Sequence, residues 1–307
     1  MENNIRIAKN DIRVCGVVKE IKNGKKFEKD GNKSIGATLV VKTGEFKEVE
    51  VKCFTGELTK KGSIKKNYEV LEKLIDGELK TLANADENNP AIMVDIYGSG
   101  DFTPHLEENS YVGGDGKLHT NPQITLGFGN IIVKDLNEED FCATFDMEVC
   151  IKNIKEEIKN EEETGRVIIE CLLPLYGNTI MPVSLVAGKV DMDGVEFDMA
   201  DAFRSEVEIG ETLELYGDIV NIARIEKVKK ESKFGIARTV EKREFVREYV
   251  ITGADEVAED KVYETDEIKE ALANREVKLQ AVVEKAENKE DAKPEKKVGF
   301  NKRRVNF

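Results

Sequence analysis

Residues 36–54 read GATLVVKTGEFKEVEVKCF and set the pattern for the first half of the chain. Apolar residues alternate with others on both sides of a Thr43-Gly44-Glu45 turn: Ala37, Leu39 and Val41 before it, and Val49, Val51 and Cys53 after it. A period of two predicts a hairpin whose strands each turn one face to a core and the other outward. The outward set is Thr38, Val40, Lys42, Lys52 and Phe54.

The length of 307 residues predicts two domains of ordinary size. No apolar run approaches the roughly 20 residues of a membrane helix, and the N-terminus has no apolar signal region. We therefore expect an intracellular protein without a membrane partner. Its place would be the cytoplasm.

Five cysteines are scattered through the chain and form no C-x-x-C pair, and the two histidines lie far from them. This spacing favours buried, reduced thiols over a zinc site. We expect no metal and no cofactor.

The net charge of −14 is unevenly distributed. Residues 1–66 hold 16 basic and 9 acidic side chains, a surplus of +7, whereas residues 135–253 hold 15 basic and 27 acidic ones. An electrostatic footprint is local, so the basic first segment can bind phosphate within an acidic protein. A lysine-rich surface that only faces water is the alternative.

The first half has a recognisable order of elements. Strands are predicted from Ile12, through the two strands of the hairpin, from Ala91 and from Gln123 to Val133, with a helix inside 61–82 capped by Ser63. Polar loops are predicted at 22–33 and 101–122, the second with a hairpin tip at Gly113–Gly116, and Gly16 suggests a bend in the first strand. Five strands with a helix between the third and fourth is the order of the OB-fold, a barrel that binds oligonucleotides or oligosaccharides.

The same order recurs after residue 135. Strands are predicted at 143–154, 166–175, 178–186, 211–222 and 244–252, with a charged loop at 155–164 and a short helix within 197–207. Tyr97-Gly98 and Tyr216-Gly217 close the fourth strand of each half, which favours a duplication. The fold prediction is mainly β, with tandem OB-like barrels at 1–134 and 135–253 and a C-terminal region at 254–307.

Two further segments carry charge. Arg224 to Arg247 holds 9 basic and 4 acidic residues in a predicted loop, which either extends a binding groove or is an amphipathic connector. The C-terminal region is predicted to form a helix from Thr265 to about Glu287, then a disordered linker over 286–297 and a basic tip. The tip holds the residues expected to contact a partner: Phe300, Arg303, Arg304 and Phe307.

Catalytic signatures are missing from the sequence. There is no phosphate-binding G-x-x-x-x-G-K-[ST] loop, and Asp191-Met-Asp-Gly194 begins like a calcium loop but lacks the later ligands. We therefore expect a protein that is not an enzyme. A nuclease that uses carboxylates and a metal is a remote alternative, because no carboxylates gather at strand ends.

Two OB-like units, a basic first segment and a tethered tip together resemble the single-stranded DNA-binding proteins of the replication machinery, above all the larger two-barrel versions of bacteriophages. The resemblance covers roughly residues 10–252, and for a phage-encoded protein it implies the cytoplasm of the host cell. It implies binding of single-stranded DNA, with RNA possible, without strong sequence preference, and recruitment of replication or recombination proteins. Bacterial members typically end in an acidic tail tipped by Pro-Phe, whereas this chain ends in Lys302-Arg-Arg-Val-Asn-Phe307, so the docking tail is not carried over.

In the mechanism that the resemblance implies, a basic groove follows the phosphates while rings stack on the bases. The candidate phosphate contacts are Arg13, Lys25, Lys26, Lys42, Lys47 and Lys52, and the candidate rings are Phe27, Phe54, Tyr97 and Phe102. A scaffold or virion component that uses the barrels to bind proteins is the alternative function, and the acidic second half favours it.

Overall fold

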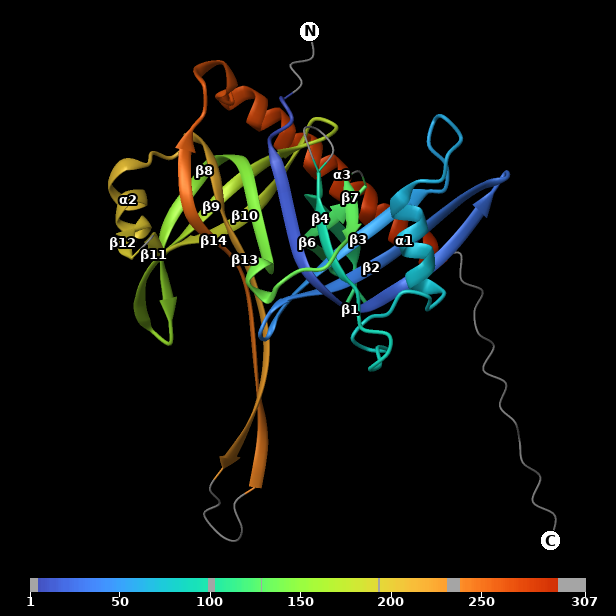
Figure 1. Cartoon of the computed structure of the whole chain (residues 1–307). Coiled ribbons are helices and arrows are strands. Elements are labelled where there is room, and N and C mark those ends of the chain that lie inside the picture. Colours follow the sequence, from blue (N-terminus) through green and yellow to red (C-terminus); the bar gives the residue numbers. More distant parts are fainter. Residues whose placement is uncertain (1–4, 99–102, 128, 193, 231–237, 292–307) are drawn as a thin grey trace, which may run out of the picture.

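The computed structural model describes residues 5–98, 103–127, 129–192, 194–230 and 238–291 (Figure 1). The strands of the first half are β1 (Asn10–Lys29), β2 (Asn32–Gly44), β3 (Lys47–Gly56), β4 (Met93–Tyr97), β5 (His105–Val112), β6 (Leu118–Leu126) and β7 (Asn130–Val133). Those of the second half are β8 (Cys142–Lys159), β9 (Glu162–Leu175), β10 (Thr179–Ala187), β11 (Lys189–Met192), β12 (Val195–Asp198), β13 (Thr212–Lys230) and β14 (Arg238–Glu256). The helices are α1 (Lys66–Ile75), α2 (Met199–Glu206) and α3 (Thr265–Asp291), with single 3-10 turns η1 (Glu138–Asp140) and η2 (Glu259–Lys261). The prediction of a mainly β protein is confirmed.

Strand pairing in the first half forms one series that runs from β6 through β3, β2, β1 and β4 to β7. β1 pairs antiparallel with β2 and β4, and β2 pairs with β3. The chain that was predicted as one closing strand, 123–133, instead contributes two: β6 runs parallel to β3, and β7 pairs with β4. Splitting this strand lets consecutive stretches reach both open edges of the sheet.

The second half has the corresponding pairings with unbroken strands, and there they form a closed cycle. β8 pairs with β9 and β13, β9 pairs with β10, and β13 pairs with β14. A single parallel pair between Val186 of β10 and Val250 of β14 completes it. A small hairpin of β11 and β12 precedes α2 and was not predicted.

The halves are joined through their strands. Residues Asn10–Cys15 of β1 pair with Cys142–Met147 of β8, so one twelve-stranded sheet runs through both. The helix α3 adds a second link, because Arg275 pairs with Glu108 of β5 and Asn274 donates to the carbonyl of Asn178, just before β10. Figure 1 shows α3 running behind the strands of both halves.

Alternation in the opening stretch gives the core as predicted. Leu39, Val41 and Val51 have no exposed side-chain surface, and Ala37, Val49 and Cys53 are also buried. Val40 was assigned to the outward set but is 1 % exposed, so that face is partly covered. At Gly16 an added Cβ would lie 2.1 Å from the carbonyl oxygen of Lys42, so the close approach of β1 to β2 requires glycine.

Three predicted polar loops are in fact ribbons of paired strands. The prediction of a loop at 22–33 is wrong. β1 and β2 continue outward to a two-residue turn at Asp30 and Gly31, whose φ angles are 51° and 76°. The prediction of a loop at 155–164 is also wrong, because β8 and β9 continue to a turn at Asn160 and Glu161. Residues 105–126 form the β5–β6 hairpin, and its tip lies at Gly113–Gly116 as predicted. Positive φ at both positions of the two-residue turns, 30–31 and 160–161, matches the right-handed twist of the strands.

Other boundaries moved. The Thr43-Gly44-Glu45 turn lies instead at Glu45 and Phe46, and α1 is shorter than the predicted stretch. Lys65, not Ser63, occupies the N-cap of α1, and it makes no side-chain cap. The helix α3 begins at Thr265 as predicted but continues to Asp291, through part of the predicted linker.

The segment from Arg224 to Arg247 is mostly strand and not a loop. β13 and β14 pair without interruption from Gly217 with Ile251 to Lys230 with Arg238. In Figure 1 this hairpin projects away from the other strands as a long arm. We call the paired stretches 223–230 and 238–247 the arm.

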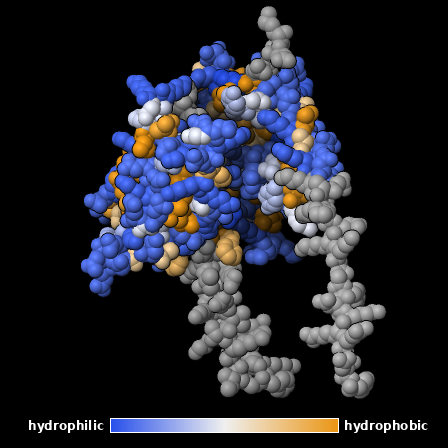
Figure 2. Space-filling view, turned by 90° about the vertical axis from the view of Figure 1, so that its right-hand side faces the viewer, coloured by the Kyte–Doolittle hydropathy of each residue, from blue (hydrophilic) through white to orange (hydrophobic). Residues whose placement is uncertain are grey.

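No helix in the described part of the chain is long and apolar enough to span a membrane. The five cysteines are free, and all except the half-buried Cys142 are buried. Figure 2 views the molecule from the side of the β1–β2 ribbon and α1, where hydrophobic residues form small separate patches within a hydrophilic surface.

Candidate nucleic-acid interface

The outer face of β1, β2 and β3 carries two phenylalanine rings side by side. Phe27 pairs in register with Ser34, and Phe54 pairs with Gly36 on the other side of β2. The ring centroids lie 6.3 Å apart at an interplanar angle of 53°. Both side chains are about half exposed, at 47 % and 53 %. Two large apolar rings left in water beside each other form a surface on which a flat apolar group can lie.

Gly36 makes room for this pair. A Cβ built there would lie 3.3 Å from Cδ2 of Phe54 and 3.5 Å from Cε2 of Phe27. A side chain at this position would therefore push into the rings or lift them. The sequence reading did not single out Gly36, although a glycine in a strand interior signals a close approach.

Lysines surround the pair on the same face. Lys25 pairs in register with Gly36, and Lys22 and Lys52 both pair with Thr38. Lys22 forms ion pairs with Glu20 and Glu50, whereas Lys25 and Lys52 form none with another described residue. Lys25 and Lys52 are exposed and therefore remain available to an anion.

Lys26 belongs to a different surface. Its Nζ lies 2.7 Å from Oδ2 of Asp76 and 3.2 Å from Oε1 of Glu72, both on or next to α1. Because side chains alternate along β1, Lys26 points away from the face that holds Lys25 and Phe27. The structure therefore does not bring this predicted phosphate contact to the phenylalanine pair.

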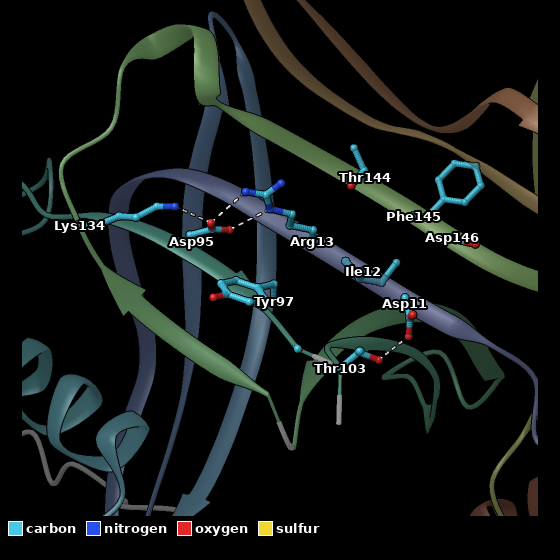
Figure 3. A pocket seen from close by; sticks show the side chains of 11 residues that line it. Asp11, Ile12, Arg13, Asp95, Tyr97, Thr103, Lys134, Thr144, Phe145 and Asp146 are labelled. Carbon is cyan, nitrogen blue, oxygen red and sulfur yellow. Dashed lines mark hydrogen bonds and ion pairs between the residues drawn. The ribbon is translucent and has the colours of Figure 1, made fainter. Parts of the chain in front are cut away.

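Arg13 and Tyr97 meet at a second place, a cavity of about 520 Å³ between β1, β4 and β8. Figure 3 shows Arg13 and Lys134 on opposite sides of Asp95, with the ring of Tyr97 nearby. Arg13 donates from Nε and Nη2 to the two oxygens of Asp95 at 3.0 and 2.9 Å, and Lys134 donates to Oδ2 at 2.7 Å. Arg13 is thus already bound by a carboxylate that is 2 % exposed.

Burial is the largest influence on Asp95 and acts to raise its pKa. The hydrogen bonds from Arg13 and Lys134 together outweigh it, so the pKa of Asp95 is lowered. The carboxylate stays ionised, and the cluster of two cations and one anion retains one positive charge. Arg13 therefore joins β1 to β4 and contributes a partly neutralised charge to the cavity.

Lys42 and Lys47 lie at the turn end of the outer face. They line a second cavity, of about 620 Å³, together with Lys19 and three glutamates. Lys42 is half-buried and Lys47 is exposed. Lys47 is also the residue of β3 that pairs with Ile222 of β13, at the base of the arm.

The β5–β6 ribbon supplies an aromatic pair that the sequence reading missed. Tyr111 stacks on His119 with centroids 5.4 Å apart and an interplanar angle of 20°. Alternation places Tyr111 on the same side of β5 as His105, whose partner Thr125 pairs with Lys52. Their symmetric spacing about the Gly113–Gly116 turn was the available signal.

His105 adds a positive charge beside Lys52 when its imidazole is protonated. Its hydrogen bond with Glu107 is the largest cause of a raised pKa for His105, and that bond also leads the lowering of the pKa of Glu107. The imidazole therefore keeps a proton to higher pH than a free histidine. The same bond leaves a carboxylate next to it, so the local gain in positive charge is small.

Phe102, Phe300, Arg303, Arg304 and Phe307 lie outside the described residues. Among the residues that are described, no three or more His, Cys, Asp or Glu side chains are arranged to hold a metal ion. The structure thus separates the predicted set into the phenylalanine pair with Lys25 and Lys52, the Arg13–Tyr97 cavity, the turn end and the isolated Lys26.

A model of the YorF family matches residues 9–291. The chain belongs to the YorF family. No curated protein matches the sequence. Among solved structures, a deletion mutant of the single-stranded DNA-binding protein from Thermus aquaticus is similar over 85% of this chain and 98% of that chain, with 10% sequence identity and a TM-score of 0.43.

Proposed function

We propose that this chain binds single-stranded DNA on the outer face of β1, β2 and β3, without strong sequence preference and without catalysis. Phe27 and Phe54 stack on bases, and Lys25 and Lys52 contact phosphates. Stacking on an aromatic ring is worth about 1–3 kcal/mol per base and tolerates every base, because each has a π face. The observation that carries the proposal is the exposed phenylalanine pair above Gly36.

In this proposal the strand pairings of each half form an OB-type barrel, with domains at 1–134 and 135–253 and a C-terminal region at 254–307. The support is the parallel pairing of the third strand of each half with its closing strand, β3 with β6 and β10 with β14. The outer face of the second and third strands, flanked by the β1–β2 and β5–β6 ribbons, is where such barrels bind oligonucleotides.

The proposed role lies in DNA replication or recombination, with the tail beyond residue 291 recruiting other proteins. Its support is the pattern of the sequence: a basic first segment, an acidic second half and a basic aromatic tip. The second half is assigned the smaller share of DNA contact, apart from the arm.

A tryptophan reporter tests the proposal directly, because the natural chain contains no Trp. In Phe54→Trp the only indole stands at the proposed stacking position, and oligothymidine should quench its emission in proportion to binding. Phe197→Trp is the matched control, since Phe197 is 48 % exposed on β12 in the second half. Equal quenching in both variants, or none in Phe54→Trp at low salt, would sink the proposal.

A further inference from the structure

Two cysteines face each other where the two halves of the sheet meet. Cys15 of β1 pairs in register with Cys142 of β8, at the end of the run of antiparallel pairs that joins these strands. Directly opposite residues of an antiparallel pair place their side chains on the same face of the sheet. In the described part of the chain, no other cysteine is paired in register with a cysteine.

The backbone spacing of this pair suits a disulfide. Directly opposite residues of an antiparallel pair have Cα atoms about 4.5 or 5.5 Å apart, depending on whether they exchange hydrogen bonds. Disulfides bridge Cα atoms about 4.4–6.8 Å apart, so a bond between Cys15 and Cys142 needs no shift of β1 against β8. Cys142 is the first residue of β8, and β13 begins to pair with β8 only at Thr144, so any remaining adjustment stays local.

One of the two thiols can be reached from solvent. Cys142 is half-buried, whereas Cys15 has no exposed surface. The next pair on the same face, Arg13 with Thr144, lines the cavity of about 520 Å³ between β1, β4 and β8. Figure 3 shows Arg13 and Thr144 on these two neighbouring strands. A small oxidant can therefore approach Cys142 from the cavity side, while Cys15 is covered.

Burial and nearby charges set how readily the two thiols ionise. Burial is the largest influence on both and raises both pKa values, that of Cys15 to about 11. The carboxylate of Asp95, which is opposite Cys15 on β4, raises them further. Arg13 acts to lower both, and a hydrogen bond from Cys15 acts to lower the pKa of Cys142. Because the thiolate is the reacting form, oxidation of this pair should become faster as pH rises.

We propose that Cys15 and Cys142 form a disulfide when the protein meets a peroxide, and that this bond joins the first half of the chain covalently to the second. The thiolate of Cys142 attacks one oxygen of hydrogen peroxide and the O–O bond breaks. The sulfur becomes a sulfenic acid, and the departing hydroxide takes up the proton that the thiol released and becomes water.

The thiolate of Cys15 completes the reaction. It attacks the sulfur of Cys142, the S–S bond forms, and the hydroxyl of the sulfenic acid leaves and is protonated to a second water. The two thiols lose two electrons in all, and the peroxide gains them. This inference does not depend on the proposed function, because it concerns the junction of the halves and not the phenylalanine pair.

The test treats the full natural chain with hydrogen peroxide under native conditions and maps the disulfide by mass spectrometry. Remaining thiols are alkylated, and the chain is cut after acidic residues without reduction. Glu148 lies between Cys142 and Cys150, so this digest separates the two cysteines. An unfolded chain would favour joining Cys142 to Cys150, because the cost of closing a loop grows with its length. The partner of Cys142 therefore reports the register of the folded protein.

We expect one cross-link, between the peptides of Cys15 and Cys142, with the mass of two hydrogen atoms lost. Cys53, Cys150 and Cys171 should remain free for alkylation once the protein is unfolded. The oxidised protein should melt about 5 °C or more above the reduced one, because the bond closes a long loop in the unfolded chain. A thiol reductant should reverse this shift.

Two variants separate the pair from the other thiols. Cys142→Ser keeps the size of the side chain but cannot form the bond, so peroxide should leave its melting temperature unchanged. Cys171→Ala is the matched control, since it removes a buried thiol outside the pair and should keep both the cross-link and the shift.

The peptide map of the natural chain decides the question even if Cys142→Ser does not fold. Oxidation of Cys142 to a sulfenic or sulfinic acid with Cys15 still free overturns the inference, and so does a cross-link to another cysteine or between two chains. A bond between Cys15 and Cys142 that leaves the melting temperature unchanged overturns the claim that it joins the halves.

Discussion

Phe27 on β1 and Phe54 on β3 belong to strands separated by β2, yet their ring centroids lie 6.3 Å apart. The glycine between them, Gly36, provides no side chain to keep them apart. Aromatic pairs at this distance and tilt attract each other modestly beyond the area they bury. Their half-exposed state means that one face of the pair is left for another ring system.

Removing either ring tests its share of binding. Phe54→Ala and Phe27→Ala should each lower affinity for oligothymidine by about 5- to 150-fold, since each loses stacking worth about 1–3 kcal/mol. The double variant should lose less than the sum, because the rings support each other. Fluorescence anisotropy measures the affinities. Phe197→Ala is the control, and an equal loss there would contradict the assignment.

Filling the space at Gly36 should separate binding from stability. Gly36→Val puts a branched side chain 3.3 Å or less from the Phe54 ring and disturbs the pair, so affinity should fall about as far as in Phe54→Ala. Valine favours a strand over glycine by up to about 1 kcal/mol, so the melting temperature should not fall by much. Gly56→Val, two registers away with nothing closer than 3.8 Å, is the control. Unchanged affinity of Gly36→Val would show that the rings are not a stacking surface.

Neighbouring lysines on β1 should behave differently. Lys25→Gln should weaken binding at low salt and reduce the salt slope by about 0.7, the value for one phosphate contact on a single strand. Lys26→Gln loses only its pairing with Glu72 and Asp76 near α1 and should bind normally. Salt titrations of the two variants side by side decide the point. The reverse order would place the DNA on the α1 side of the ribbon.

Acid should lower the stability of the second half by protonating a carboxylate in the cluster of Arg166, Glu157 and Glu248. Arg166 donates to Glu157 and Glu248 and so ties β9 to β8 and β14, next to the single pair that closes the strand cycle. The hydrogen bonds from Arg166 are the largest cause that lowers the pKa of Glu157 to about 2. A lowered pKa contributes stability above the ordinary value of 4.5, and that stability is lost as pH falls toward 2.

Glu157→Gln should therefore unfold more easily at pH 7 and show a shallower decline of stability between about pH 4.5 and 2. Urea unfolding at several pH values measures both effects. Glu161→Gln, at the exposed β8–β9 turn, makes the same change of charge without these contacts. A decline as steep as that of the natural protein would exclude Glu157 as its source.

The helix α3 should hold the two halves together through Arg275. Its guanidinium lies 2.6 Å from Glu108, and the side chains are 18 % and 14 % exposed. Arg275→Ala leaves Glu108 largely buried without its partner, so the free energy of unfolding should fall by about 3 kcal/mol. Lys269→Ala, from an exposed pair with Asp266, should change it by less than about 1 kcal/mol. Chemical denaturation of both variants measures the loss of unfolding free energy. Equal small losses would show that the Arg275–Glu108 pair does not hold the two halves together.

The sequence by itself determined the parts that bury one face. Ala37, Leu39 and Val41 alternate because a half-buried strand must place every second side chain in the core, and this pattern is local. The same signal gave the order of the main elements in both halves and the start of α3 at Thr265, but neither the division of 123–133 into β6 and β7 nor the β11–β12 hairpin. Alternation did not predict the polar ribbons, because strands that are exposed on both faces need no alternation of apolar and polar residues. The Gly113–Gly116 tip was the one predicted sign of them, and the Asp30-Gly31 dipeptide, a turn signal for the β1–β2 ribbon, was not used.

Only the tertiary structure decided which candidates share a site. Lys25 and Lys26 are identical in type and adjacent in sequence, yet one faces the phenylalanine pair and the other faces α1. Arg13 looked like a free cation until β4 placed the buried Asp95 against it. Both outcomes depend on partners 46 or more residues away in the chain, and no local pattern carries such contacts. The pairing of Lys47 with Ile222 is of the same kind, since it joins β3 of the first half to β13 of the second.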